Sequence, residues 1–142
     1  NGILAGFPVI DVKVALYDGS FHNVDSSEMA FKISGSMGFK KGALEAKPVI
    51  LEPIMNMTIQ IPKDCVGDVI GDINSRRGKV MGMDSEIKFE VITAQAPMAE
   101  ILEYAPDLTS ITGGRGLFST EFSHYDEVPS HLTDAIIAAS KE

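Results

Sequence analysis

The sequence predicts an α+β protein of two small units, the first ordered strand–helix–strand and the second ordered βαββαβ with a final helix. Three observations support this prediction. Short segments alternate apolar and polar residues as half-buried strands do, helical stripes of apolar residues separate them, and Glu52-Pro53 is a plausible joint between the two sets. We therefore expect one unit over residues 1–52 and another over residues 53–142.

The first unit is expected to open with a strand over residues 10–16, which ends at the turn residues Asp18-Gly19. A helix follows, with Asp25 accepting from the first-turn amides and Glu28 reaching back to the cap. Its apolar stripe has four-residue spacing (Met29, Ile33, Met37). Three glycines in the same helix each cost up to about 1 kcal/mol, so a closely packed partner is expected. Residues 48–51 are a candidate for a short buried strand.

The second unit is expected to open with a strand over residues 55–61, where methionine and isoleucine alternate with polar residues. A helix begins at Pro62 and ends at Arg76-Arg77-Gly78. The basic pair suits the helix dipole, and the glycine suits a left-handed cap. Two strands are expected next, at residues 79–83 and 87–93.

The remaining elements complete a recognisable order. Pro97 opens a helical stretch that Pro106 breaks or restarts. Alternation over residues 118–124 predicts a fourth strand, and Pro129 starts the terminal helix. The order βαββαβ is the ferredoxin-like plan, which hosts many functions and identifies none of them.

Composition restricts the class of protein and of partner. A chain of 142 residues that is 44% hydrophobic can form a real core. Its one cysteine, Cys65, excludes an internal disulfide, and no apolar run approaches the roughly 20 residues that span a bilayer. We therefore expect a cytoplasmic protein without a membrane partner. The formal net charge of −8 argues against holding nucleic acid by bulk electrostatics, so any RNA contact must come from a few placed groups or follow docking by other parts of a larger molecule.

No catalytic constellation stands out in the sequence. The cluster Gly113-Gly114-Arg115-Gly116 lacks the ending of a phosphate loop and is better interpreted as a tight turn. Cys65 lies in the first turn of a helix, but no base partner is evident, so a small semi-buried residue is the simpler interpretation. The three histidines lack metal-binding spacing, and His124 is expected in or beside the core. We expect no catalytic residue, metal site or cofactor in this chain.

Two sets of residues are candidates for binding. His22 lies between Phe21 and Asn23 in an exposed-looking loop, where a merely solvated histidine is the alternative. The chain has only three arginines (Arg76, Arg77, Arg115). Arginine suits bidentate contact with phosphate, although simple helix-end and turn charges are at least as good an interpretation.

Several long motifs run in order along essentially the whole chain: DGSFHNVDSSEMAFK at residues 18–32, LEPIM at 51–55, GDVIGDINSRRG at 67–78, and HYDEVP at 124–129, with Gly114-Arg115-Gly116 before the last. Together they resemble bacterial elongation factor G. The first is similar to the tip and following helix of its fourth domain, and the second to the junction into its fifth domain. The others resemble the first helix and the last strand of that fifth domain.

The resemblance implies that residues 1–52 are the second half of domain IV and residues 53–142 are domain V. It implies the ribosome as partner, through ribosomal RNA of both subunits, the stalk base, and transfer RNA and messenger in the decoding site. The implied decoding-site tip comprises Gly19, Ser20, Phe21, His22 and Asn23, and the three arginines become candidate ribosomal RNA contacts. The family's nucleotide-binding domain lies far upstream, so this chain is expected not to hydrolyse GTP, which is the cofactor of the parent protein.

Departures from the family pattern leave alternatives open. Thr109 replaces a usual arginine, and residues 83–87 lack a common glycine-bearing turn. These changes lean towards the elongation-factor-G-like paralogue of some bacteria, so ribosome protection or recycling is one alternative role. A freestanding ferredoxin-like module for a small metabolite is another, although no residue cluster suggests its pocket.

The resemblance also implies an incomplete first unit, because domain IV completes its sheet with strands from its own first half. The remaining segment would expose apolar surface and an open strand edge. We expect residues 1–52 to be poorly ordered or paired with another chain, including a second copy, whereas the second unit folds independently.

Overall fold

The computed structural model describes residues 2–10, 12 and 27–141. These residues divide into two compact units, one of Leu51–Glu127 and one of Asn1–Ile50 with Val128–Glu142. The C-terminal helix thus groups with the first unit, whereas the domain division at residue 52 predicted from the sequence stays a prediction. Apart from Ile10 and Val12, the strand predicted over residues 10–16 lies outside the described residues.

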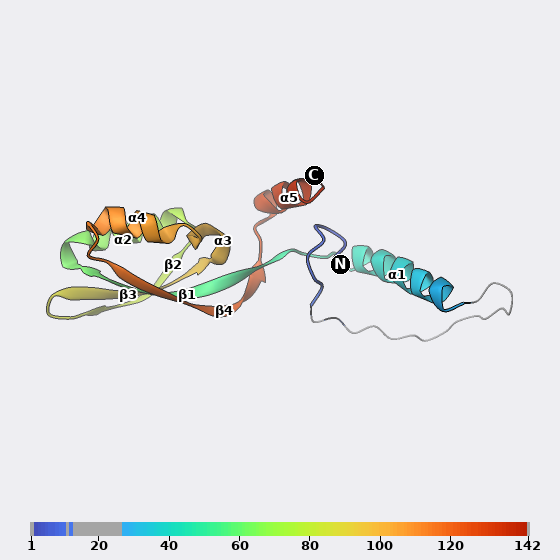
Figure 1. The fold of residues 1–142 in the computed structure, drawn as a ribbon, viewed down its shortest axis with the longest axis horizontal. Helices are drawn as coiled ribbons and strands as arrows, with labels where there is room; N and C mark the ends of the chain where they lie inside the picture. Colours follow the sequence, from blue (N-terminus) through green and yellow to red (C-terminus); the bar gives the residue numbers. More distant parts are fainter. Residues whose placement is uncertain (1, 11, 13–26, 142) are drawn as a thin grey trace. The chain divides into compact units, whose positions relative to one another are not determined.

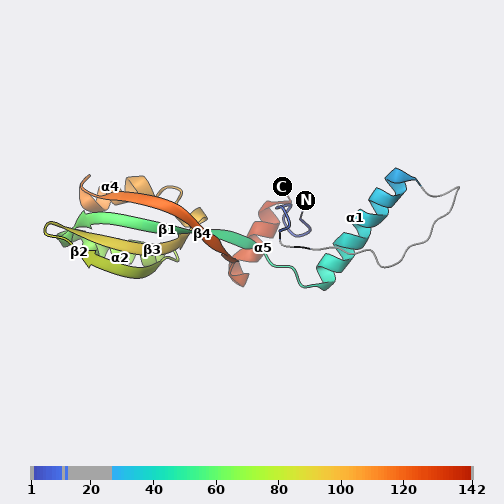
Figure 2. The same ribbon diagram turned by 90° about the horizontal axis from the view of Figure 1, so that it is seen from below.

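A four-stranded antiparallel sheet forms the unit Leu51–Glu127. Its strands are β1 (Leu51–Pro62), β2 (Lys79–Ser85), β3 (Phe89–Pro97) and β4 (Leu117–Glu127), in the order β2-β3-β1-β4. The helical segments are η1 (Lys63–Cys65), α2 (Val66–Ser75), α3 (Met98–Ile101) and α4 (Tyr104–Thr112). Helices α2, α3 and α4 lie on one face of the sheet (Figure 1). The same arrangement is seen from below in Figure 2. The α+β class and the ferredoxin-like plan predicted from the sequence are confirmed.

The core of this unit follows from alternation along its two central strands. Because Ile59 pairs with Ile92 across the β1–β3 ladder, the buried residues of both strands share the face that the helices cover. The helices contribute their own inward stripes. The cluster includes Met57, Ile59, Ile61, Ile92, Ala94, Ala96, Val69, Ile73, Tyr104 and Leu108.

Two connections in the sheet unit differ slightly from the predicted bounds. The β2–β3 hairpin turns at residues 86–88, where Glu86 N donates to Phe89 O at 2.9 Å, so β3 begins later than predicted and runs on to Pro97. Pro106 is the third residue of α4, where its missing amide donor breaks no helical hydrogen bond. The predicted restart of the helix is observed, but it begins at Tyr104, two residues before the proline.

A bulge in β4 overturns one prediction. Ile54 pairs with His124 while Met55 pairs with Phe122, so Ser123 is an extra residue that interrupts the alternation. His124 is exposed, with Nδ1 2.8 Å from Ser123 Oγ, and Phe122 is 51% exposed. The prediction that His124 packs in or beside the core is therefore wrong.

The other unit contains α1 (Glu28–Glu45) and α5 (Ser130–Ala139). Ser27 caps α1, because its Oγ accepts from Ala30 N at 3.1 Å. The predicted cap residue Asp25 lies outside the described residues, and Glu28 pairs with Lys32 Nζ at 3.0 Å.

The apolar stripe of α1 is exposed, with Met29, Ile33 and Met37 at 72%, 55% and 67%. No residue of this helix is buried, and a Cβ built on any of its glycines meets nothing within 4 Å among the described residues. The closely packed partner expected from the sequence is therefore not found in the described part of the chain, whereas the expected exposure of apolar surface is observed.

The segment before β1 is not a strand of its own. Residues 48–50 are irregular, and only Leu51 of the predicted strand 48–51 is extended, as the first residue of β1. Ile50 is nevertheless buried, and its carbonyl accepts from Val128 N at 2.9 Å. No helix in the described ranges is long and apolar enough to cross a membrane.

Candidate functional site

The three arginines lie at two places in the sheet unit. Burial of Val69 and Ile73 fixes the rotation of α2 about its axis. Arg76 and Arg77 follow its last residue, and their side chains reach α3 and the start of β1. Arg115 lies in the turn that joins α4 to β4. These surroundings decide which guanidinium groups are available for an external phosphate.

Arg76 is held inside the unit by three acceptors. Its Nε donates to Asp72 Oδ2 at 2.9 Å, its Nη1 donates to Glu100 O at 2.8 Å, and its Nη2 contacts Asp107 Oδ2. The guanidinium also lies 5.2 Å from the centre of the Tyr104 ring, a cation–π distance. Burial lowers the pKa of Arg76, but the hydrogen bonds and charges of the two aspartates outweigh burial and raise it. This side chain, 16% exposed, links α2 to α3 and α4.

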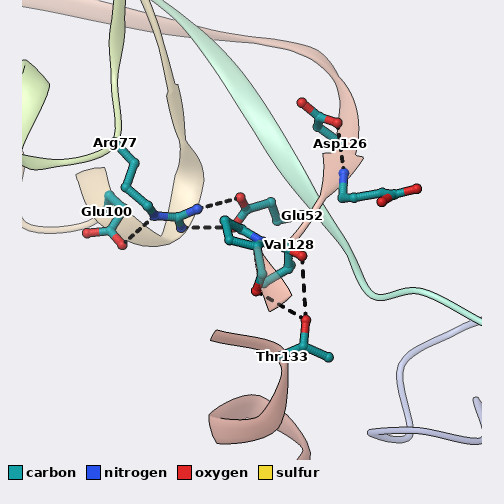
Figure 3. A network of polar contacts seen from close by, with 8 residues as sticks. Glu52, Arg77, Glu100, Asp126, Val128 and Thr133 are labelled. Atoms are coloured by element: carbon teal, nitrogen blue, oxygen red, sulfur yellow. Dashed lines mark hydrogen bonds and ion pairs between the residues drawn. The ribbon is translucent and has the colours of Figure 1, made fainter. Parts of the chain in front are cut away.

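Arg77 forms the most regular ion pair of the unit (Figure 3). Its Nη1 and Nη2 donate to the two carboxylate oxygens of Glu52 at 2.8 and 3.0 Å, and its Nε donates to Glu100 Oε1 at 3.1 Å. This is the bidentate geometry that makes arginine–carboxylate pairs strong. The hydrogen bonds to Glu52 raise the pKa of Arg77, so the group stays charged.

The end of α2 overturns a further prediction. The left-handed residue is Arg77, with φ of 57°, and not Gly78. Arg77 N donates to Asn74 O and Gly78 N to Ile73 O, which is the Schellman pattern of a helix end. Gly78 is required for another reason, since a Cβ there would lie 2.7 Å from Ile73 O and 2.5 Å from Ile73 Cγ2.

Arg115 is the most accessible of the three arginines, with its side chain 57% exposed. Its Nε donates to Thr112 O at 3.0 Å, and its Nη2 donates to Asp64 Oδ2 at 3.3 Å. Gly113 and Gly114 before it have φ of 60° and 80°, so the predicted tight turn is confirmed. Among the described residues, the guanidinium has one weak carboxylate contact.

The other candidates divide between buried and undescribed residues. The tip residues Gly19, Ser20, Phe21, His22 and Asn23 lie outside the described residues. Cys65 is 5% exposed, and its thiol lies 3.8 Å from Ile111 O, so the small residue predicted to be semi-buried is buried. Within the described ranges, no group of three or more His, Cys, Asp or Glu side chains is arranged to hold a metal ion.

Sequence reasoning missed the carboxylates that hold the arginines. Glu52 and Glu100 are 25 and 23 residues from Arg77, and only the fold brings them together. Asp72 was accessible to sequence reasoning, because it precedes Arg76 by four residues on a predicted helix and such pairs commonly interact.

The phenol of Tyr104 carries a testable consequence of burial. This residue is fully buried, and its hydroxyl has no hydrogen-bond partner among the described residues. Burial raises its pKa to about 12, so the folded state keeps the proton that an unfolded chain loses near pH 10. Stability contributed by the neutral phenol is therefore present below pH 10 and lost as the pH rises towards 12.

We expect Tyr104→Phe to leave stability at pH 7 unchanged or raised by up to about 1 kcal/mol, because it removes an unsatisfied buried hydroxyl. We also expect the variant to lose less stability than the wild-type chain between pH 10 and 12. Urea unfolding at several pH values measures both, with exposed Tyr125→Phe as the matched control. A loss of more than about 1 kcal/mol at pH 7 would mean that the hydroxyl has a partner after all.

Comparison with known proteins agrees with this architecture. The family model described as "Elongation factor G, domain IV" matches residues 1–47, and that described as "Elongation factor G C-terminus" matches residues 49–136. Elongation factor G of Aquifex pyrophilus is 56% identical over 137 residues, which cover 96% of this chain and 20% of that protein. A crystal structure of a protein from Thermus thermophilus superposes with a TM-score of 0.85 at 48% identity, over 99% of this chain and 21% of that one.

This chain thus spans about a fifth of the length of both relatives. Two family models match it in succession, and the relative from Aquifex is more than half identical to it over nearly its whole length. On these grounds the chain belongs to the elongation factor G family.

Proposed function

We propose that this chain is the ribosome-contacting C-terminal region of a translational GTPase that promotes movement of transfer RNA and messenger through the ribosome. The succession of a domain IV match and a C-terminal match supports this proposal. Residues 1–52 then belong to domain IV and residues 53–142 to domain V. GTP is bound and hydrolysed by another part of the parent protein, which works in the cytoplasm.

The surroundings of the three arginines indicate which of them is available to contact ribosomal RNA. Arg76 and Arg77 each bond carboxylates of their own unit, whereas Arg115 is exposed and has one carboxylate partner in the described part of the chain, at 3.3 Å. We therefore propose Arg115 as the phosphate contact of the sheet unit, whereas Arg76 and Arg77 lie towards the opposite end of the β1–β4 ladder and hold α2, α3 and β1 together. In the other unit, the tip residues 19–23, with His22 foremost, are proposed to enter the decoding site.

Co-sedimentation of the 142-residue chain with purified ribosomes tests this proposal. We expect saturable binding that weakens as salt rises, and a several-fold loss for Arg115→Gln with a salt slope lower by about 1. His22→Ala is also expected to weaken binding. Lys88→Gln, an exposed charge change in the β2–β3 turn, serves as the matched control.

Binding that is equal for wild type, Arg115→Gln and His22→Ala would contradict the assigned contacts. No binding at low salt would show that the chain does not contact the ribosome without the rest of the protein. Two copies could also pair through the exposed stripe of α1, and the sedimentation coefficient of the free chain at rising concentration reports such pairing.

A second role within the same lineage rests on α4. Thr109, which replaces the arginine usual at this position, is exposed, and its Oγ1 donates to Ala105 O at 2.9 Å. We propose ribosome protection or recycling as the alternative function on this ground. A chimaeric factor that carries this chain in place of the matching fifth of a translocase distinguishes the two roles by its translocation and subunit-splitting rates.

A further inference from the structure

Arg77 adopts a backbone conformation that glycine would adopt more readily. Its φ of 57° places a long side chain in the left-handed region, which costs an L-residue free energy relative to glycine. The neighbouring Gly78 is not the left-handed residue, so the helix end does not use its glycine for this purpose. The side chain of Arg77 must therefore contribute something that glycine at position 77 cannot provide.

The contribution lies at the first residues of β1. Glu52 is the second residue of this strand, and its side chain is only 12% exposed. Its carboxylate accepts hydrogen bonds from both Nη groups of Arg77. The partner strand β3 extends along β1 only as far as the pair Ile54–Pro97. Residues 51–53 of β1 therefore have a described strand on one side alone, where they pair with residues 125–127 of β4.

This short end of the ladder has an unfavourable distribution of charge. Glu52 lies directly opposite Asp126, and the next pair is Leu51 with Glu127. Like charges directly opposite each other destabilise a strand pair. Asp126 Oδ1 accepts from Glu127 N at 2.8 Å, whereas the carboxylate of Glu52 is neutralised by Arg77.

Both connections to the other unit leave from this end of the ladder. Ile50 precedes Leu51 and Val128 follows Glu127, and Val128 N donates to Ile50 O at 2.9 Å just beyond the last pair of the ladder. Opening of residues 51–53 from 125–127 would separate the two connecting segments on the side of the sheet unit.

We propose that Arg77 is a positioning residue that keeps the terminal β1–β4 pairs closed by neutralising Glu52, and so keeps the two connections between the units paired. Its left-handed backbone is retained because this conformation brings the guanidinium to Glu52 and Glu100 together. This inference does not depend on ribosome binding and adds a structural device at the joint that the proposed function would use.

Hydrogen exchange of the 142-residue chain tests the inference. We expect Arg77→Gln to speed exchange in segments 51–54 and 125–128 at least tenfold, with much smaller changes in the core around Ile59 and Ile92. Arg77→Gly separates the two features of the residue, because it relieves the backbone but removes the cation. It should open the same two segments while restoring global stability relative to Arg77→Gln.

A double variant provides the sharpest control. In an Arg77→Gln background, Glu52→Gln removes the repulsion with Asp126 and should restore most of the lost protection, whereas Arg115→Gln alone should change neither segment. Uniform acceleration across the unit, or no rescue by Glu52→Gln, would overturn the proposal. Unchanged exchange in both segments for Arg77→Gly would overturn it as well.

Discussion

Gly78→Ala is expected to destabilise the sheet unit by about 3 kcal/mol. The added Cβ would lie 2.7 Å from Ile73 O and 2.5 Å from Ile73 Cγ2. The carbonyl cannot move away, because it accepts the hydrogen bond from Gly78 N that closes the end of α2. The Ile73 side chain cannot move either, because it is 1% exposed within the core. Urea unfolding followed by circular dichroism measures the loss.

Gly71→Ala is the matched control for this prediction. Gly71 lies in the same helix, is exposed, and has open space where a Cβ would be built. The added methyl group should therefore raise stability by roughly 0.5–1 kcal/mol through helix propensity alone. Equal effects of the two substitutions would show that the helix end relaxes around residue 78 and that the close approach has no energetic consequence.

Arg76→Met is expected to cost about 2–3 kcal/mol, because the change leaves two aspartates and a main-chain carbonyl without their donor. Asp72, the Glu100 carbonyl and Asp107 lie on three different helical segments, so the packing of α2 against α3 and α4 should loosen together. The stem of methionine retains part of the apolar contact with Tyr104, which isolates the charge and the hydrogen bonds. Urea unfolding of this variant beside the wild-type chain measures the loss.

Arg115→Met removes the same kind of side chain from an exposed turn and should change stability by no more than about 0.5 kcal/mol. Its opposite pattern, a small effect on folding and a several-fold effect on ribosome binding, is what distinguishes an available arginine from an internal one. A large stability loss for Arg115→Met together with a small one for Arg76→Met would contradict this assignment.

The strands of the sheet could be predicted wherever alternation and burial agree. Residues 55–61 carry a strict period of two, and the structure buries Met57, Ile59 and Ile61 as that period requires. Prediction failed where a local signal was decided by distant partners. At the end of α2, the glycine indicated a left-handed position, but close approach to Ile73 and the reach of Arg77 to Glu52 place that conformation one residue earlier.

His124 and residues 48–51 failed for a related reason. A bulge shifts the faces of β4 at Ser123, and no feature of a single strand's sequence marks where its partner will skip a residue. Residues 48–50 have the apolar character of a strand but no described ladder partner, so their extended pairing begins only at Leu51.

For the candidate site, the sequence identified the arginines but not their availability. The sequence does not distinguish the accessibility of the three arginines, whereas the fold surrounds two of them with carboxylates from other segments. Whether an arginine is available to an external phosphate depends on contacts with residues 23 to 31 positions away in the sequence. Neither the spacing of motifs nor the composition reveals such contacts.

The burial of Cys65 gives the chain a built-in chemical reporter. A thiol reagent reaches a side chain that is 5% exposed only when the structure around it opens, and the chain has no second thiol to compete. Because Cys65 lies between β1 and α2 in the core cluster, its rate of modification reports how often the sheet unit opens. This chain therefore needs no engineered label for the opening of its sheet unit to be followed.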